Sequence, residues 1–288
     1  MCLLCDLKSP SPSESVHSTR WSSRRAFLLV GAATVGTAAA PAMAQVDVGK
    51  ASSMRKLVPA AELEGAATQQ YGELIQEARQ KRVLLPASHP QVRRLRNMAQ
   101  RLIPQSTPWN GRASAWNWEV NLIQSDQINA FCMPGGKIAF YTGILDKLRL
   151  SDDEAAMIMG HEMAHALREH ARERLAKTQA TGLGLSVLSS LLGLGNLGDA
   201  AASLGTQLLT LRFSREDETE ADLVGLELAA RAAYAPSASV SLWQKMAEAN
   251  GKSGLSFLST HPSGPDRIRQ LQANVPKVMK LYEAARKS

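Results

Sequence analysis

Two histidines and a glutamate stand at a spacing that suits metal-dependent hydrolysis. The sequence reads His161-Glu162-Met163-Ala164-His165, and the residues before it are largely apolar. On a helix, positions four apart lie on one face, so both imidazoles can bind the same metal ion. Glu162 then lies where it can act as the base for a water that zinc activates. The alternative interpretation is a pair of structural histidines on the surface of an amphipathic helix.

A catalytic zinc site needs a third protein ligand besides two imidazoles. The acidic stretch 214–222 contains Glu218 and Asp222, which are four residues apart and share a helical face. We therefore predict Glu218 as the third ligand and Asp222 as the hydrogen-bond partner that orients a ligand histidine. Glu216 and Glu220 fall on other faces, where we expect solvated side chains. Taken alone, such a stretch is also typical of an exposed charged helix.

Mostly helical elements must position these residues. Ser151 and Glu154 form a capping box, which opens the helix that carries the two histidines. Apolar residues at helical spacing and the positions of prolines predict helices over much of the remaining chain. The expected helices cover residues 60–82, 90–102, 151–177 and 200–232, with two more that begin at Pro236 and Asp266.

A small sheet is expected before the two-histidine helix. Residues 116–122 alternate between apolar and polar side chains, which is the pattern of a half-buried strand. Residues 128–133 and 137–141 form two more candidate strands, joined by a glycine-containing turn at 134–136. We expect an antiparallel sheet that packs on the active-site helix. The predicted fold class is therefore α+β and mostly helical.

The composition is that of a globular protein and excludes several classes of function. The chain has 288 residues, of which 44% are hydrophobic, and a net charge of +7 from 33 basic and 26 acidic residues. No long block of like charge carries this excess, so we do not expect nucleic-acid binding. Three cysteines in a chain of this length exclude a disulfide-stabilised scaffold.

Residues 1–44 are predicted to be an export signal. Arg24 and Arg25 precede an uncharged run that ends in a small-x-small pattern at Ala44, which is the arrangement of a cleaved secretory signal. The arginine pair resembles a twin-arginine signal and indicates a periplasmic protein. The alternative is a membrane anchor, because the run approaches the roughly 20 residues that span a bilayer.

The rest of the chain is expected to form one domain with an insert. Residues 45–59 show no periodicity and are expected to be a flexible start, and residues 60–288 form the single domain. Within it, residues 182–198 carry no charge and are rich in glycine and leucine. This insert lies between the two metal-bearing helices, where we expect a hairpin or lid that touches the membrane surface or gates the cleft. The alternative is a hairpin that packs into the core.

The two-histidine helix and the later Ser-Arg-x-x-Glu-x-x-Ala-Asp pattern, which begins at Ser214, resemble one zinc metallopeptidase family. This family includes the HtpX protease and the CAAX prenyl protease, and the similarity is closest to its soluble periplasmic members BepA and LoiP. Further motifs at 129–136, 143–145 and 260–268 agree, so the resemblance covers about residues 60–275. It implies a gluzincin fold with one zinc ion per chain, Glu162 as general base, Asp222 as outer partner, and the ligands His161, His165 and Glu218.

The other histidines differ in what they are expected to do. The same resemblance singles out His261, in a Thr-His-Pro motif, as a switch that binds zinc and holds the enzyme latent or as a stabiliser of the oxyanion. The alternative is a loop histidine with neither role. His170 follows His165 by five residues, which is about 140° around a continuous helix, so we do not expect it to bind the same metal and expect a structural or solvated side chain. His89 is expected in a loop.

A peptide substrate is expected to bind along a sheet edge, because an extended peptide can add to an exposed strand through main-chain hydrogen bonds. The candidate edge consists of Asn129, Ala130, Phe131 and Cys132 and leads through the glycine turn toward the active-site helix. The alternative is an ordinary inner strand. Cys132 is expected to be a small buried residue rather than a reactive thiol.

Together, the motifs and the resemblance predict a zinc-dependent endopeptidase of the cell envelope. The resemblance implies polypeptide substrates, in particular misfolded or misassembled envelope and outer-membrane proteins. Two alternatives keep the metal site but change its use: a chaperone-like assembly protein with a latent zinc site, and a zinc hydrolase that acts on something other than peptides. A third alternative treats the two histidines as structural.

Overall fold

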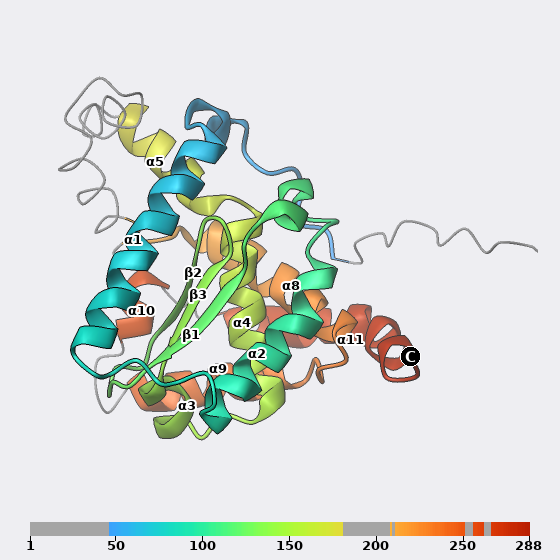
Figure 1. Cartoon of the computed structure of the whole chain (residues 1–288). Helices are drawn as coiled ribbons and strands as arrows, with labels where there is room; N and C mark the ends of the chain where they lie inside the picture. Colours follow the sequence, from blue (N-terminus) through green and yellow to red (C-terminus); the bar gives the residue numbers. More distant parts are fainter. Residues whose placement is uncertain (1–45, 181–207, 209–210, 251–255, 262–265) are drawn as a thin grey trace, which may run out of the picture. The chain divides into compact units, whose positions relative to one another are not determined.

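The described part of the chain is organised around a three-stranded sheet and the helices that cover it (Figure 1). The computed structural model describes residues 46–180, 208, 211–250, 256–261 and 266–288. The predicted export signal at 1–44 and the predicted insert at 182–198 lie outside these residues. Among the described residues, no helix combines the length and the apolar character that are needed to cross a bilayer.

The sheet consists of β1 (Glu119–Ile123), β2 (Ala130–Met133) and β3 (Lys137–Tyr141), in the order β1-β3-β2. β2 and β3 pair antiparallel, whereas β1 and β3 pair parallel. The prediction of a purely antiparallel sheet is therefore wrong, and the sheet is mixed. The alternation of side chains identifies strands, but it contains no information about which neighbour a strand takes. β2 and its flanking loops supply the long connection that a parallel pair requires.

A tight hairpin turn joins β2 to β3, as the glycine pair predicts. Gly136 has a φ of +77°, a left-handed conformation that side chains rarely adopt. A Cβ atom at this position would lie 2.6 Å from the ring of Trp118. Both the backbone conformation and the packing therefore require glycine at this turn.

Both faces of the sheet are buried by helices. Successive residues of a strand point to opposite sides, so each strand contributes side chains to both faces. Helix α1 (Ala60–Gln80) packs on the face that includes Ala139. Helices α2 (Pro90–Leu102) and α4 (Asp152–Leu167) contribute to the core on the face that includes Ile138. Figure 1 shows α1 on one side of the strands and α4 on the other. This burial fixes α4, which carries the two-histidine motif, against the sheet.

The helix expected over 151–177 is two helices in the structure. The capping box at its start is present, since Ser151 and Glu154 each accept a hydrogen bond from the other's backbone N–H. The second helix, α5 (His170–Ala180), begins after Glu169, whose φ is +60°. A residue in the left-handed region cannot continue a right-handed helix, so the chain changes direction there. The apolar periodicity of the sequence does not mark this break.

The second metal-bearing helix, α8, spans Arg215–Arg231. The sequence indicated one helix over 200–232, but residues 211–214 are not helical. The start of α8 is fixed by a capping box between Ser214 and Asp217. Acidic residues in its first turn lie at the positive end of the helix dipole, which stabilises their charge.

The remaining helices complete the fold around α4 and α8. The helix predicted from Pro236 begins two residues later as α9, and the last predicted helix follows Asp266, which makes no side-chain capping bond. In the range 45–59, where a flexible start is expected, the structure has one short 3-10 helix and buries Val46. These elements are α3 (Thr142–Lys147), α9 (Ala238–Asn250), α10 (Ser256–Thr260), α11 (Arg267–Ala285), η1 (Ser53–Leu57), η2 (Ile103–Gln105) and η3 (Gly111–Ala115).

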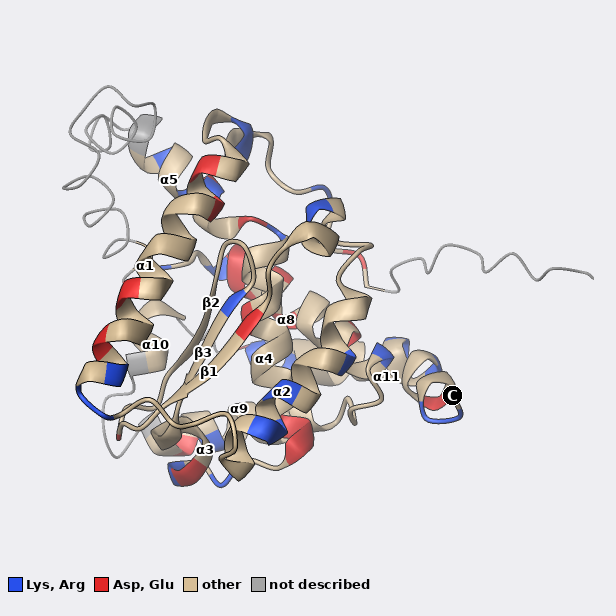
Figure 2. Cartoon of the chain, viewed as in Figure 1, with Lys and Arg blue, Asp and Glu red and all other residues tan. Residues whose placement is uncertain are grey.

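Charged residues are distributed over several helices of the described chain (Figure 2). A different kind of charge occurs where α4, α8 and α11 meet, because Glu162, Glu218, Asp222 and Arg267 are all buried there. Burial of a charge costs free energy unless the charge is paired or binds a metal. This region is therefore the candidate site of chemistry.

Candidate metal centre

Helices α4 and α8 approach closely enough for side chains from both to meet at one point. Gly160 of α4 and Gly225 of α8 lie at the contact, and a Cβ atom on Gly225 would be 2.6 Å from the backbone nitrogen of His161. Only a hydrogen atom fits between the two backbones there. Because Gly160 directly precedes His161, this contact sets the distance between the ligand residues of the two helices.

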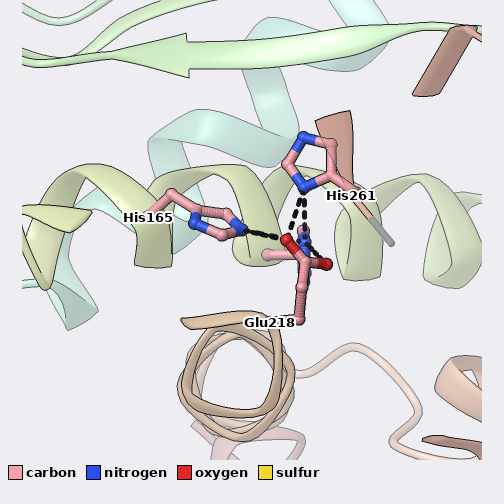
Figure 3. A group of neighbouring side chains, drawn as sticks. His165, Glu218 and His261 are labelled. Carbon is pink, nitrogen blue, oxygen red and sulfur yellow. Dashed lines mark hydrogen bonds and ion pairs between the residues drawn. The ribbon is translucent and has the colours of Figure 1, made fainter. Parts of the chain in front are cut away.

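Four side chains converge at this point, three of which are labelled in Figure 3. They are the imidazoles of His161, His165 and His261 and the carboxylate of Glu218, and all four are buried. Nε2 of His161 and Nε2 of His165 lie 3.1 Å apart and face the Glu218 carboxylate at 3.5 and 3.3 Å. Nδ1 of His261 lies 3.0 Å from Glu218 Oε1 and 3.4 Å from His161 Nε2.

This set of donors fits a zinc ion. Zinc binds imidazole nitrogen and carboxylate oxygen in a tetrahedron at about 2.0–2.2 Å, so its ligand atoms lie roughly 3.4 Å from one another. The separations of 3.0 to 3.5 Å between five of the six residue pairs agree with this geometry, and all four donor atoms lie within 4.8 Å of one another. A set rich in imidazole also favours zinc over calcium or magnesium, which prefer oxygen. The predicted ligands are therefore brought together, with His261 as a fourth donor.

The predicted outer residue Asp222 lies behind His161. Its Oδ1 is 3.0 Å from Nδ1 of His161, the ring nitrogen that points away from the cluster. Such a contact fixes the tautomer and the orientation of a ligand histidine. Arg267 binds Asp222 at 2.6 and 2.7 Å and Glu218 at 3.0 Å, and its guanidinium lies over Trp243. This role was missed, since the only signal for Arg267 in the sequence is its place in the 260–268 motif.

Burial and pairing shift the ionisation of the ligands in different directions. Burial lowers the pKa of His161, but contacts with Asp222 and Glu218 outweigh it and raise that pKa to about 9. Burial lowers the pKa of His165 well below its ordinary value, against the attraction of Glu218. Burial alone would raise the pKa of Glu218, but hydrogen bonds with the three imidazoles hold it well below its ordinary value. The cluster therefore keeps a carboxylate and a neutral imidazole available for a cation.

Glu162 lies beside the four donors and lines a cavity. Its Oε1 is buried, has no hydrogen-bond partner among the described residues and lies 3.6 Å from Nε2 of His261. Burial raises the pKa of the Glu162 carboxyl, against the attraction of His261 and His161. An unsatisfied carboxylate oxygen in this position can take a proton from a water and return it to an amine.

The cavity extends from Glu162 along strand β2. In the described chain β2 pairs with β3 alone and lies at the edge of the sheet. Residues 129–134 line the cavity together with Phe213. Cys132 is buried, and burial raises the pKa of its thiol well above the ordinary value. The predicted edge residues therefore lie where an extended chain in the cavity would meet them.

Comparison with known families agrees with the donor set. The sequence profile described as Peptidase family M48 matches residues 89–275, which is more than half of the chain and includes Glu162 and all four donors. The chain belongs to peptidase family M48. The predicted fold class and the predicted zinc site are confirmed at the level of this M48 family.

Individual relatives support the M48 assignment. The chain is 35% identical over 205 residues to the mitochondrial metalloendopeptidase OMA1 of Schizosaccharomyces pombe, a match that covers 70% of this chain and 58% of the relative. It is 30% identical over 212 residues to OMA1 of Saccharomyces cerevisiae, which covers 69% and 60%. It is 26% identical over 208 residues to the metalloprotease LoiP of Escherichia coli, which covers 68% and 75%. Both OMA1 identities exceed the identity to LoiP, so the expectation that the similarity is greatest to the periplasmic members is wrong. The chain spans about three fifths of these OMA1 proteins.

Two residues of this M48 chain that were not expected near the site lie behind its ligand His165, with His170 in contact with that ring and Glu220 in contact with His170. His170 is buried, and its Nδ1 is 2.9 Å from Nδ1 of His165. Glu220 faces Nε2 of His170 at 3.3 Å and Nε of Arg168 at 2.7 Å, so it is paired rather than solvated. His170 is not one of the four donors, as expected, but the assumption of one continuous helix was wrong. The left-handed Glu169 breaks that helix and turns His170 back toward His165.

The other residues set aside in the sequence stay apart from the chemistry. Glu216 is exposed, as predicted from its face of the helix. His89 is the N-cap residue of α2 and accepts a hydrogen bond from the backbone N–H of Gln91. His89 therefore has a local structural role.

Proposed function

We propose that the chain is a zinc-dependent endopeptidase that hydrolyses peptide bonds in unfolded polypeptides. The observation that carries this proposal is the position of Glu162. Its Oε1, which makes no hydrogen bond among the described residues, lies next to the four-donor cluster, and Glu162, His165 and His261 all line the cavity along β2. A peptide in that cavity would bring a carbonyl to the metal site and the adjoining nitrogen to Glu162.

The residues around the cluster divide the work of hydrolysis. When bound, zinc supplies Lewis acidity that polarises a peptide carbonyl and makes a nearby water a better nucleophile. Glu162 accepts a proton from that water and returns it to the nitrogen of the departing amine. Its burial favours proton uptake, because burial raises the pKa of this carboxyl. Asp222 holds the hydrogen on Nδ1 of His161, so that the lone pair of Nε2 faces the cluster.

The substrate is proposed to bind as an extended strand on β2. An edge strand has main-chain N–H and C=O groups on its outer side, and these groups can pair with an incoming peptide. β2 lies at the sheet edge in the described chain, and residues 129–134 line the cavity that contains Glu162. Recognition through the main chain suits a peptidase that accepts many unfolded sequences.

His261 is proposed to hold the enzyme latent. Catalytic zinc sites leave one position open for water, whereas Nδ1 of His261 lies in the fourth donor position of this cluster. If His261 is such a latch, His261→Ala increases the basal cleavage of unfolded casein by the zinc-loaded chain. A lower turnover with unchanged zinc content would instead identify His261 as a stabiliser of the oxyanion. An unchanged rate would contradict both roles.

We further propose that the chain acts in the cell envelope on misfolded or misassembled proteins. The export pattern in residues 1–44 and the family resemblance support this location. Fractionation of cells that express the full chain tests it. Replacement of both Arg24 and Arg25 by lysine should leave the precursor in the cytoplasm, and an unchanged distribution would contradict the twin-arginine signal.

The decisive test of catalysis is Glu162→Gln, which removes the base but keeps the size of the side chain. Cleavage of unfolded casein should be lost while one zinc ion per chain is retained, and the same result is expected in the His261→Ala background. Glu216→Gln is the matched control, because Glu216 is an exposed carboxylate, and it should cleave at the normal rate. Continued cleavage by Glu162→Gln would overturn the proposed mechanism.

One rival is favoured by a specific observation. The four-donor cluster is already closed by His261, which is what a chaperone-like assembly protein with a latent zinc site would show. Such a protein needs the shape of the site but not its base. If Glu162→Gln restores the phenotype of a deletion strain as fully as the normal chain does, the binding function replaces the peptidase.

A further inference from the structure

The rings of the two helix-borne ligand histidines are supported from behind by different groups. Nδ1 of His161 meets the carboxylate of Asp222 at 3.0 Å, whereas Nδ1 of His165 meets Nδ1 of His170 at 2.9 Å. Only 1% of the surface of His170 is exposed. His170 belongs to α5 and reaches His165 because the left-handed Glu169 turns the chain between the two helices.

The hydrogen bonds behind His165 allow one arrangement of hydrogens when this ring binds a metal. Nε2 of His165 faces Glu218 and the other donors, so it is the metal-binding nitrogen. Nδ1 of His165 then carries the ring hydrogen and donates it to Nδ1 of His170. Nε2 of His170 consequently carries the hydrogen of the second ring and donates it to Oε2 of Glu220 at 3.3 Å. Each hydrogen bond from His165 through His170 to Glu220 therefore has one donor and one acceptor.

Arg168 completes this chain of contacts on its outer side. Its Nε donates to the same Oε2 of Glu220 at 2.7 Å, which holds the carboxylate toward His170. The guanidinium also donates to the backbone oxygen of Gly49 at 3.1 Å. Only 7% of the surface of Arg168 is exposed, whereas 28% of the Glu220 side chain is, so water reaches only the outer part of these contacts.

We propose that His170 is a positioning residue for zinc binding. It accepts the Nδ1 hydrogen of His165, keeps that ring in the tautomer that presents Nε2 to the metal, and is itself held by Glu220 and Arg168. This inference rests on the zinc site of the proposed function but not on peptide hydrolysis. Hydrogen-bond partners of metal-binding histidines contribute about 10- to 100-fold to metal affinity. Loss of the His170 contact is expected to weaken zinc binding within that range.

Three substitutions of His170 separate its two contacts. His170→Leu removes both. His170→Asn places an amide oxygen near the former Nδ1, where it can accept from His165, but it is too short to reach Glu220. His170→Gln extends toward Glu220 and has no acceptor at the Nδ1 position. The zinc dissociation constant of the full chain, measured by competition with a chromophoric chelator, should rise about 10- to 100-fold in the leucine variant. Asparagine should recover most of the affinity and glutamine little of it.

A matched variant and two further measurements make this test decisive. His89→Leu makes the same replacement at the N-cap of α2 and should leave zinc affinity unchanged. The melting temperature of the zinc-free protein shows whether each variant is folded. Ring nitrogen chemical shifts of the zinc-loaded chain should place the hydrogen of His170 on Nε2. If the leucine variant does not fold, Glu220→Gln provides the test, with an expected loss of zinc affinity below about tenfold.

The contradicting outcomes are specific to His170. Zinc affinity within twofold of normal in His170→Leu, equal recovery by asparagine and glutamine, or a hydrogen on Nδ1 of His170 would each overturn the positioning role. A chain that cleaves casein yet shows one of these outcomes contradicts only this inference. A chain that binds zinc as expected but never cleaves a polypeptide contradicts only the proposed peptidase.

Discussion

The two sides of the metal centre hold their ligand histidines with different chemistry. On the α8 side, His161 is in direct contact with a carboxylate, Asp222, which is paired with the buried Arg267. On the α5 side, Nδ1 of His165 is in contact with a second imidazole, His170. The carboxylate of Glu220 contacts His170 and does not contact His165 directly. One histidine is therefore supported by a charge and the other by a ring that only transmits a hydrogen bond.

This difference determines how strongly each ligand competes for protons. Contacts with Asp222 and Glu218 raise the pKa of His161 to about 9, although burial opposes them. Burial lowers the pKa of His165 well below its ordinary value, and the attraction of Glu218 does not compensate. The two histidines of one motif are thus not equivalent. His161 binds a proton more strongly than an ordinary histidine, so a proton competes with the metal there. His165 binds a proton weakly, so its ring stays available to the metal.

The largest effect is expected from a change that breaks both sides at once. Gly225→Ala adds a methyl group 2.6 Å from the backbone nitrogen of His161, and backbone atoms cannot move aside as a flexible side chain does. Helices α4 and α8 must separate, which is expected to cost about 1–3 kcal/mol of unfolding free energy. Because the ligands come from both helices, we expect stoichiometric zinc binding to be lost. Thermal unfolding and elemental analysis of the purified full chain measure the two effects.

Gly72→Ala is the matched control for this prediction. Gly72 lies within α1, is exposed, and has nothing within 4 Å of an added Cβ atom. Alanine in such a position is expected to stabilise the helix by roughly 0.5–1 kcal/mol and to leave zinc binding unchanged. Normal zinc content in Gly225→Ala would show that the α4–α8 distance does not set the geometry of the site.

The ligands themselves could be predicted from the sequence because their geometry is local. His161 and His165 are four apart on one helix, as are Glu218 and Asp222 on another, and helical spacing alone places each pair on one face. Because a zinc site needs a third protein ligand, the sequence also predicted that these two helices meet at one site. Of the positions that the sequence indicated, these depend least on the tertiary structure, and the structure brings all of them together.

The parts that could not be predicted depend on where the chain turns. His170 reaches His165 only because Glu169 adopts a left-handed conformation. The residue types around position 169 do not predict this conformation. Arg267 reaches Asp222 through the packing of α11, 45 positions away in sequence. The parallel pairing of β1 with β3 depends on strand order, which side-chain alternation does not contain. Helix breaks and long-range packing, rather than motif residues, limit what the sequence reveals.

Removal of charge on either side tests the contrast directly. Asp222→Asn keeps the shape and an acceptor oxygen beside His161 but removes the charge, and we expect zinc affinity to fall by about 100-fold, the upper end of the range for such partners. Glu220→Gln makes the same change one residue further from the metal and should cost less than about tenfold. Chelator competition on the full chain compares the two. Equal losses would show that direct contact with a charge is not what distinguishes the two sides.

The pH dependence of zinc binding should follow the proton on His161. Since the pKa of this imidazole is raised to about 9, the zinc-free protein holds a proton there at neutral pH, and zinc must displace it. Apparent affinity is therefore expected to fall about tenfold for each unit that the pH drops below 9. In Asp222→Asn the fall should begin nearer the ordinary histidine value of about 6.5. Affinity that does not change between pH 7 and 8.5 in the normal chain would contradict this assignment.

The smallest effect is expected at Cys132, which lies in the cavity wall but supports neither histidine. Burial raises the pKa of its thiol well above the ordinary value, so the group stays protonated at pH 8, where an exposed thiol near its ordinary pKa of about 8.5 is partly ionised. Because only the thiolate reacts, alkylation of Cys132 by iodoacetamide should be much slower in the native chain than in urea. Mass spectrometry of the Cys132 peptide measures both rates.

Cys132→Ala should leave the zinc dissociation constant within about twofold, because the contacts that position the ligands lie on α5, α8 and α11 rather than on the strand. Rapid native labelling, or a loss of zinc affinity as large as that of Glu220→Gln, would contradict this. The strand β2 would then support the metal ligands as the α5 and α8 sides do.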